Sequence, residues 1–181
     1  MLIGLSGKQR SGKDTFADFL VELYGFKKVS FANPIKELAV NYFGLNPVEV
    51  YETKPEKVRI ILQDIGKIGR KVDDLFWVKK TLDKFDNFDD IDVVVSDVRF
   101  INEAEYIRSK GGIIVRIESS RDIRASRGLL TGENDISEIE LDNYDFDYVI
   151  NNEGTIEEFY DAITQLMNIL LHKWTQMKVK Q

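Results

Sequence analysis

The sequence predicts an α/β fold in which a parallel five-stranded sheet carries helices on both faces. Short apolar runs alternate with longer amphipathic stretches along the chain, a pattern typical of parallel strands joined by helical crossovers. One run, Val93-Val94-Val95, is apolar at successive positions, as expected of a central strand buried on both faces. The 181 residues, 43% of them hydrophobic, are enough for a single domain over residues 1–181.

Five strands are expected, each from an apolar or β-branched run. They span residues 2–6, 28–31, 92–97, 113–117 and 147–150. Ligands of such sheets bind at the carboxyl ends of the strands. We therefore expect Ser6-Gly7 and Asp97, which end the first and third strands, to lie at the functional edge.

Helices are expected between these strands and after the last one. They span residues 12–24, 34–43, 55–66, 73–85, 102–110 and 155–174. Two of them begin at a proline, which the first turn of a helix tolerates. Apolar residues recur at helical spacing throughout 155–174, which favours a helix packed on the sheet over a partner-binding face. Ser137 and Glu140 have the spacing of a capping box at a further helix start.

The composition excludes several classes of function. With 25 Lys and Arg against 31 Asp and Glu, the net charge of -6 does not favour polymeric nucleic acid or anionic membranes as partners. There is no cysteine and His172 is the single histidine, so thiolate sites and histidine clusters for metals are excluded. No apolar run approaches the ~18 residues of a membrane span. Met1 leads directly into the first strand, and we expect a soluble, cytoplasmic protein.

The segment from Gly7 to Lys13 has the glycine and lysine spacing of a phosphate-binding P-loop and lies between a strand and a helix. Gly7 and Gly12 permit backbone angles that turn consecutive N–H groups toward an anion, and the helix start adds its positive dipole end. Lys13 would reach the outer phosphates. A fortuitous glycine-rich turn is the less favoured alternative.

Asp14 stands where the P-loop pattern has Ser or Thr, and Thr15 follows one residue late. A carboxylate is a hard oxygen ligand for Mg²⁺, so Asp14 could bind the metal directly or through water, or face the acceptor. The alternative is a carboxylate that stabilises the positive end of the helix.

The segment VVVSDVRF places Asp97 at a strand end and Arg99 two residues later. P-loop proteins keep a metal-organising carboxylate at such a strand end, and arginine can hold phosphate through two hydrogen bonds. A simple capping role for Asp97 is equally open.

Three further groups are candidates for binding. Arg59 and Gln63 share a helix face near Arg70, and Trp77 could be a core residue or a surface that stacks on a base. Arg121, Arg124 and Arg127 recur every three residues with no matching acids beside them, which suits a mobile lid that closes on a triphosphate. A solvated helix is the alternative for these arginines. The turn at Asn151 could meet an adenine edge or simply close a strand.

Several segments resemble, in order, motifs of the deoxynucleoside monophosphate kinases of tailed phages, within the nucleoside monophosphate kinase-like P-loop proteins. They are SGKQRSGKDTFADF, FANPIKELA, VRIILQDIG, FWVKK, VVVSDVRFINEAEYIRSKGG and DFDYVINNEGTIEEF. The resemblance covers nearly the whole chain and includes Asp14. The stretch between Asn46 and Lys57 is short compared with members that carry a large insertion there. The range of bases and the oligomer contacts, a homodimer included, are therefore left open.

The resemblance implies a three-layer P-loop NTPase fold with a small lid at about residues 118–145 and monophosphate-binding helices at about 34–86. It implies transfer of the γ-phosphoryl group of ATP to a deoxynucleoside monophosphate, with Mg²⁺ and small-molecule nucleotides only, in the host cytoplasm if the chain is phage-encoded. Another small-molecule P-loop kinase, of adenylate, dephospho-coenzyme A or phosphomevalonate type, is the main alternative. A nucleotide-binding regulator without turnover is the other, and the second phosphate site at Asp97-Val98-Arg99 argues against it.

Together, the motifs and the resemblance imply four groups of site residues. The groups are Gly7, Arg10, Ser11, Gly12, Lys13, Asp14, Thr15 and Asn151 for ATP; Asp14, Thr15 and Asp97 for the metal; Arg59, Gln63, Arg70, Trp77, Asp97 and Arg99 for the monophosphate; and Lys13, Asp97, Arg99, Arg121 and Arg124 for catalysis.

Overall fold

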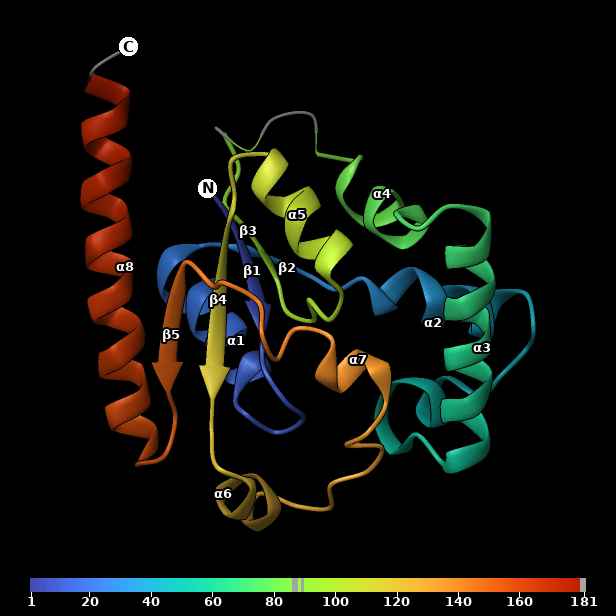
Figure 1. Ribbon diagram of the computed structural model, residues 1–181. Coiled ribbons are helices and arrows are strands. Elements are labelled where there is room, and N and C mark those ends of the chain that lie inside the picture. The colour runs from blue at the N-terminus through green and yellow to red at the C-terminus, as the bar shows by residue number, and fades with distance from the viewer. Residues whose placement is uncertain (86–87, 89, 180–181) are drawn as a thin grey trace.

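The computed structural model describes residues 1–85, 88 and 90–179 and contains the expected parallel sheet (Figure 1). Its strands are β1 (Leu2–Ser6), β2 (Lys27–Val29), β3 (Val93–Val95), β4 (Ile113–Glu118) and β5 (Tyr148–Asn151), in the order β2-β3-β1-β4-β5. All four pairings are parallel, with Ile3 opposite Val94 on one side and Ile113 on the other. The central strand β1 is buried along its whole length, so the loop that follows it begins from a fixed position.

Helices cover both faces of the sheet, as the alternating pattern predicted. On one face, α1 (Lys13–Tyr24) and α8 (Ile156–Val179) pack Phe16, Leu20, Ile163 and Met167 against the strands. On the other, α4 (Phe76–Leu82) and α5 (Ile101–Ser109) contribute Val78, Leu82, Ala104 and Ile107 to a second core. The three-layer fold is thereby confirmed.

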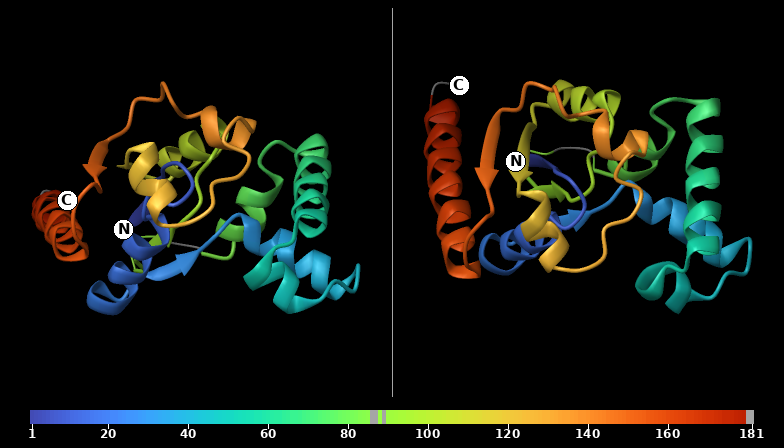
Figure 2. Two further views of the ribbon diagram at one scale, coloured as in Figure 1. Left: turned by 90° about the horizontal axis from the view of Figure 1, so that it is seen from below. Right: turned by 60° about the horizontal axis from the view of Figure 1, so that its bottom comes forward.

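A third cluster lies beside the sheet, where Figure 2 shows a group of helices set apart from the strands. It is formed by α2 (Ala32–Asn41), α3 (Glu56–Val72), α4 and the short π-helical turn η1 (Glu49–Thr53). Ala39, Val50, Val58, Ile65 and Trp77 are its buried members. These helices occupy the segment expected to bind the monophosphate, residues 34–86. Residue 86, the last of that segment, lies outside the described residues.

Several boundaries differ from those expected. The helix predicted to stop at Gly66 continues to Val72, because Gly66 and Gly69 are buried against neighbouring helices and do not end it. Asp73 ends α3 in an extended conformation and its carboxylate accepts the N–H of Leu75, so α4 starts later than predicted. The final helix extends past 174, to Val179.

The segment expected to form the lid, residues 118–145, leaves the carboxyl end of β4 and contains α6 (Arg121–Ser126) and α7 (Ile136–Ile139) (Figure 1). The predicted capping box at Ser137 is wrong: Asp135 is the N-cap residue of α7 and its carboxylate accepts the N–H of Ser137. Glu140 instead accepts the N–H of Ile101 at the start of α5. Among the described residues, no helix is long and apolar enough to cross a membrane.

Candidate active site

The loop between β1 and α1 has the backbone conformation that its glycines predicted. Gly7, Arg10 and Gly12 have positive φ angles of 153°, 65° and 112°. A Cβ at Gly7 would lie 2.4 Å from the Ser11 hydroxyl oxygen and 2.5 Å from the carbonyl oxygen of Ile117, so only glycine fits there. The Ser11 hydroxyl is buried and has no hydrogen-bond partner among the described residues, which leaves a polar group of the loop available to a ligand.

Lys13 opens α1 and is only 8% exposed. Its Nζ donates to the carbonyl oxygens of Gly7 and Lys8 at 2.6 and 2.9 Å, across the loop. Burial, followed by the nearby charge of Arg99, lowers the pKa of Lys13 to about 8. The ammonium group is therefore held at the loop in an environment that favours an added anion.

The ends of the loop are tied to the lid and to β5 by Arg127. Its guanidinium donates to the carbonyl oxygens of Arg10 and Asn152, and the Asn152 amide donates to the carbonyl oxygen of Ser11 at 2.8 Å. Arg10 in turn donates to the carbonyl oxygens of Arg127 and Leu129. Asn152 thus touches the loop, whereas the predicted Asn151 is the exposed last residue of β5.

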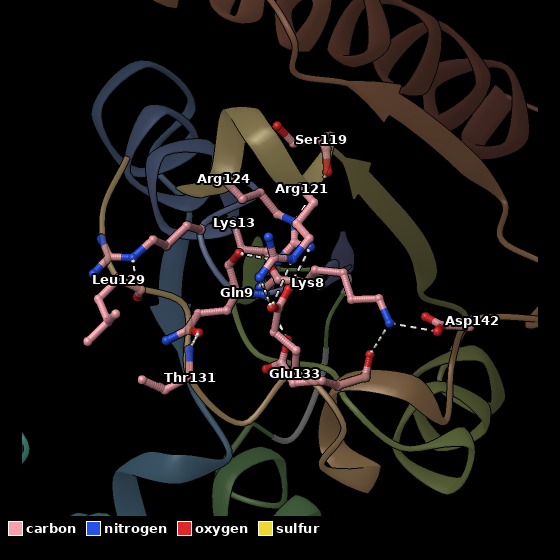
Figure 3. Close-up of polar contacts among 12 residues, drawn as sticks. Lys8, Gln9, Lys13, Ser119, Arg121, Arg124, Leu129, Thr131, Glu133 and Asp142 are labelled. Atoms are coloured by element: carbon pink, nitrogen blue, oxygen red, sulfur yellow. Dashed lines mark hydrogen bonds and ion pairs between the residues drawn. The ribbon is translucent and has the colours of Figure 1, made fainter. Parts of the chain in front are cut away.

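The arginines of α6 do have an acidic partner, contrary to expectation. Glu133 accepts from Arg121 at 3.0 Å and from Arg124 at 3.2 Å (Figure 3). Glu133 comes 9 residues after Arg124 and 12 residues after Arg121. It meets them only because of the path that the chain takes between α6 and α7. Arg124 is 7% exposed and also donates to the carbonyl oxygens of Ser119 and Gln9, while the Arg121 side chain is 68% exposed.

One carboxylate joins the loop to the Asp97-Val98-Arg99 segment. Glu138 of α7 accepts the backbone N–H of Gln9 at 2.8 Å and accepts a short hydrogen bond from the Arg99 guanidinium. Burial opposes the charge on Arg99, but Glu138 outweighs it and raises the pKa of Arg99. Lys8 holds the same helix, because its Nζ donates to the carbonyl oxygen of Glu138. The same Nζ also donates to Asp142 (Figure 3).

Asp97 caps the start of α2. The sequence had left open this capping role and the role of a carboxylate that organises a metal. Its two carboxylate oxygens accept from the Ser30 hydroxyl and from the N–H groups of Phe31 and Ala32, at 2.7 to 3.0 Å. Asp14 lies in the first turn of α1 with its side chain 80% exposed, and pairs with Lys28 of β2 at 2.9 Å. Thr15 follows it, half-buried.

The remaining acceptor-side candidates are spread along α3 and α4. Arg59 donates to the hydroxyl of Thr131. The Arg70 guanidinium lies over the ring of Phe100, 4.7 Å from the ring centroid, and Phe100 directly follows Arg99 in the sequence. Gln63 is exposed. Trp77 is 6% exposed and donates to the carbonyl oxygen of Gly66 at 2.9 Å, which favours the core alternative over a stacking surface.

Several residues of the site were not predicted from the sequence. They are Lys8, Gln9, Glu103, Thr131, Glu133, Glu138, Asp142 and Asn152. Glu103 accepts the N–H groups of Arg99 and Phe100, and burial raises the pKa of this carboxyl to about 8. Most of these residues act across more than 30 positions of sequence, so no local spacing identifies them.

A family model described as deoxynucleotide monophosphate kinase matches residues 1–56 and 40–163 of the chain. A protein of Acanthamoeba polyphaga mimivirus, provisionally named a deoxynucleotide monophosphate kinase, is 31% identical over 90% of this chain and 94% of its own length. The deoxynucleotide monophosphate kinase of Enterobacteria phage T4 is 24% identical over 93% of this chain and 99% of its own length. That alignment has 247 positions against 181 residues here, so the phage protein contains segments that this chain lacks.

Solved structures with the same fold include shikimate kinase from Acinetobacter baumannii in complex with shikimate. Its TM-score is 0.56 with 16% identity, over 95% of this chain and 93% of that one. At this level of identity the match shows the fold alone.

Proposed function

The chain belongs to the deoxynucleotide monophosphate kinase family and transfers a phosphoryl group from ATP to deoxynucleoside monophosphates, and we propose that the β1–α1 loop holds the donor while Arg99 and α3 hold the acceptor. Kinase activity sets aside the alternative of a regulator without turnover. The observation that carries the residue assignment is the bridge at Glu138: the Gln9 N–H and the Arg99 guanidinium are close enough for one carboxylate to contact both. A donor phosphate at the loop and an acceptor phosphate at Arg99 would then be neighbours.

In this proposal the protein positions two anions and neutralises their charge, which is the main requirement of phosphoryl transfer. Lys13 and the loop amides bind the outer phosphates of ATP, and the unpartnered Ser11 hydroxyl is a further donor there. Arg99, with Arg70 and Arg59 nearby, holds the acceptor phosphate in line. No general base is needed, because the attacking phosphate oxygen is already ionised.

Mg²⁺ fits the oxygen donors at the start of α1. Magnesium is usually held by one or two protein oxygens together with substrate phosphates and water. Asp14 presents an exposed carboxylate in the first turn of α1, and Thr15 with its hydroxyl is the next residue of that turn. Its surface pair with Lys28 is of a kind that contributes little to stability and can open. Asp97, whose oxygens cap α2, would act on the metal through water. Bound there, Mg²⁺ would neutralise charge on the phosphates.

We further propose that the substrates are free nucleotides alone, since a net charge of -6 does not favour binding of a polyanionic nucleic acid. The lid is assigned to about residues 118–145 and the acceptor-binding helices to 34–86. A homodimer and a cytoplasmic location stay predictions.

The decisive experiment is an ADP-release assay across an acceptor panel of deoxynucleoside monophosphates, ribonucleoside monophosphates and non-nucleotide alcohols such as shikimate. Turnover with one or more deoxynucleoside monophosphates and none with the alcohols is expected. Arg99→Ala should raise KM for the monophosphate far more than KM for ATP. An unchanged monophosphate KM in that variant would overturn the assignment of Arg99.

A further inference from the structure

Glu138 is a nearly buried carboxylate in the middle of the groups assigned to phosphate. Its side chain is 8% exposed. One oxygen accepts the Gln9 N–H and the other accepts from Arg99, and the carboxylate is also close enough to Lys13 to act on its charge. Three donors suited to a phosphate are therefore directed at or near a side-chain anion of the same chain.

We propose that the Glu138 carboxylate occupies a phosphate subsite formed by the Gln9 amide and Arg99, and that it competes with the nucleotide for this subsite. The inference rests on the proposed function and goes beyond it by naming an internal competitor. A carboxylate and a phosphate accept the same hydrogen bonds, and two anions cannot share one amide and one guanidinium without strong repulsion. The triphosphate needs the Gln9 amide of this subsite and the acceptor phosphate needs Arg99, so binding of either one must displace Glu138 from that contact.

The surroundings of Glu138 allow this displacement without loss of the lid. The helix that carries it, α7, is a single turn of four residues. Lys8 holds the backbone of this turn through the carbonyl oxygen of Glu138 and through Asp142, independently of the carboxylate. The side chain can therefore leave the subsite while α7 stays attached to the loop.

The test compares Glu138→Gln, which keeps the shape and removes the charge, with Glu22→Gln at the exposed far end of α1, which changes the net charge equally. The probe is inorganic tripolyphosphate without Mg²⁺, titrated into the full chain by calorimetry at low salt. Glu138→Gln should lower Kd about tenfold or more, the size expected when a charge-assisted hydrogen bond no longer competes, and Glu22→Gln should leave Kd close to that of the wild type.

An unchanged or weaker affinity in a folded Glu138→Gln variant would overturn the proposal. If that variant does not fold, as judged by circular dichroism, Glu138→Asp tests the same point, because its shorter arm weakens the contacts while keeping the charge. It should also bind more tightly than the wild type, by a smaller factor, and equal affinity would overturn the idea. Failure of the wild type to release ADP with any monophosphate would instead contradict the proposed function.

Discussion

The indole of Trp77 fills the space that a side chain at Gly69 would need. A Cβ at Gly69 would lie 2.4 Å from Cε2 of the ring, and one turn earlier the carbonyl oxygen of Gly66 accepts the indole N–H. Two glycines in the middle of α3 thus let α4 pack against it at close range. The relative position of these helices, which carry acceptor-side residues, depends on this contact.

Gly69→Ala should therefore lower the free energy of unfolding by about 1–3 kcal/mol, since the added methyl forces the ring or the helix to move. Gly66→Ala is the matched control in the same helix. There the new Cβ would meet the end of the flexible Arg70 side chain at 3.3 Å and Ile35 at 3.4 Å. It should be neutral or stabilise by up to about 1 kcal/mol through helix propensity. Urea unfolding of both variants checks this, and equal losses would contradict the Trp77 explanation.

The layers of the fold were predictable because they depend on local periodicity. The Val93-Val94-Val95 run and the apolar stripe of the last helix report burial directly. A strand and a helix are present at these two places, although the strand is shorter and the helix longer than expected. The end of α3 was not predictable in this way. A glycine stops a helix or makes room for a neighbour, and only the position of Trp77 decides between the two.

The loop and its lysine were also readable from the sequence, since a P-loop is a contiguous motif. The carboxylates that surround it were not. Glu133 and Glu138 come from a lid segment with no periodic pattern, and they meet Arg124 and Arg99 only once the chain has crossed the sheet. Asp97 was identified, but its three donors from residues 30–32 belong to another strand end.

Lys13→Ala should reduce kcat by orders of magnitude while leaving the fold intact. The side chain supplies the one ammonium group held at the loop carbonyls in the described structure, and its loss removes charge stabilisation of the transferred group. A thermal melt by circular dichroism confirms folding alongside the ADP-release assay. Near-normal turnover in a folded variant would refute the role of Lys13.

The affinity for ATP should fall as pH rises through about 8. Burial and then Arg99 lower the pKa of Lys13 to about 8, so the free protein loses this positive charge more than two pH units below an ordinary lysine, which titrates at about 10.4. The charged form binds phosphate, and kcat/KM for ATP should therefore decline above pH 8. Lys13→Arg, which stays charged, should lack this decline. A flat wild-type profile up to pH 9.5 would contradict the assignment.

Glu103→Gln should change how stability depends on pH. Burial raises the pKa of Glu103 to about 8 in the folded chain, from an ordinary value of 4.5 when unfolded. The folded state then binds the extra proton between these values, so its contribution to stability is present below pH 4.5 and is lost as pH rises to 8. The slope is at most about 1.4 kcal/mol per pH unit. Glutamine copies the protonated form, so the variant should gain stability relative to the wild type from pH 5 to pH 8. Thermal melts of both proteins at pH 5 and pH 8 measure this. A difference in Tm between variant and wild type that is the same at both pH values would contradict the raised pKa.

The two lid arginines should separate into one structural and one functional residue. Arg124 is buried and donates to the carbonyl oxygens of Ser119 and Gln9 and to Glu133, so Arg124→Ala removes a buried side chain and three part-buried hydrogen bonds and should lower the free energy of unfolding by about 1–3 kcal/mol. Arg121 is exposed and, within the described residues, its side chain pairs with Glu133, so Arg121→Ala should cost little stability, as surface ion pairs contribute about 0–1 kcal/mol. If Arg121 reaches the transferring phosphoryl group when the lid closes, its loss should still lower kcat strongly, because such a contact exists only in the transition state. Unfolding curves and kcat measured on both variants decide the matter: an Arg121→Ala enzyme with full kcat would limit this side chain to pairing with Glu133.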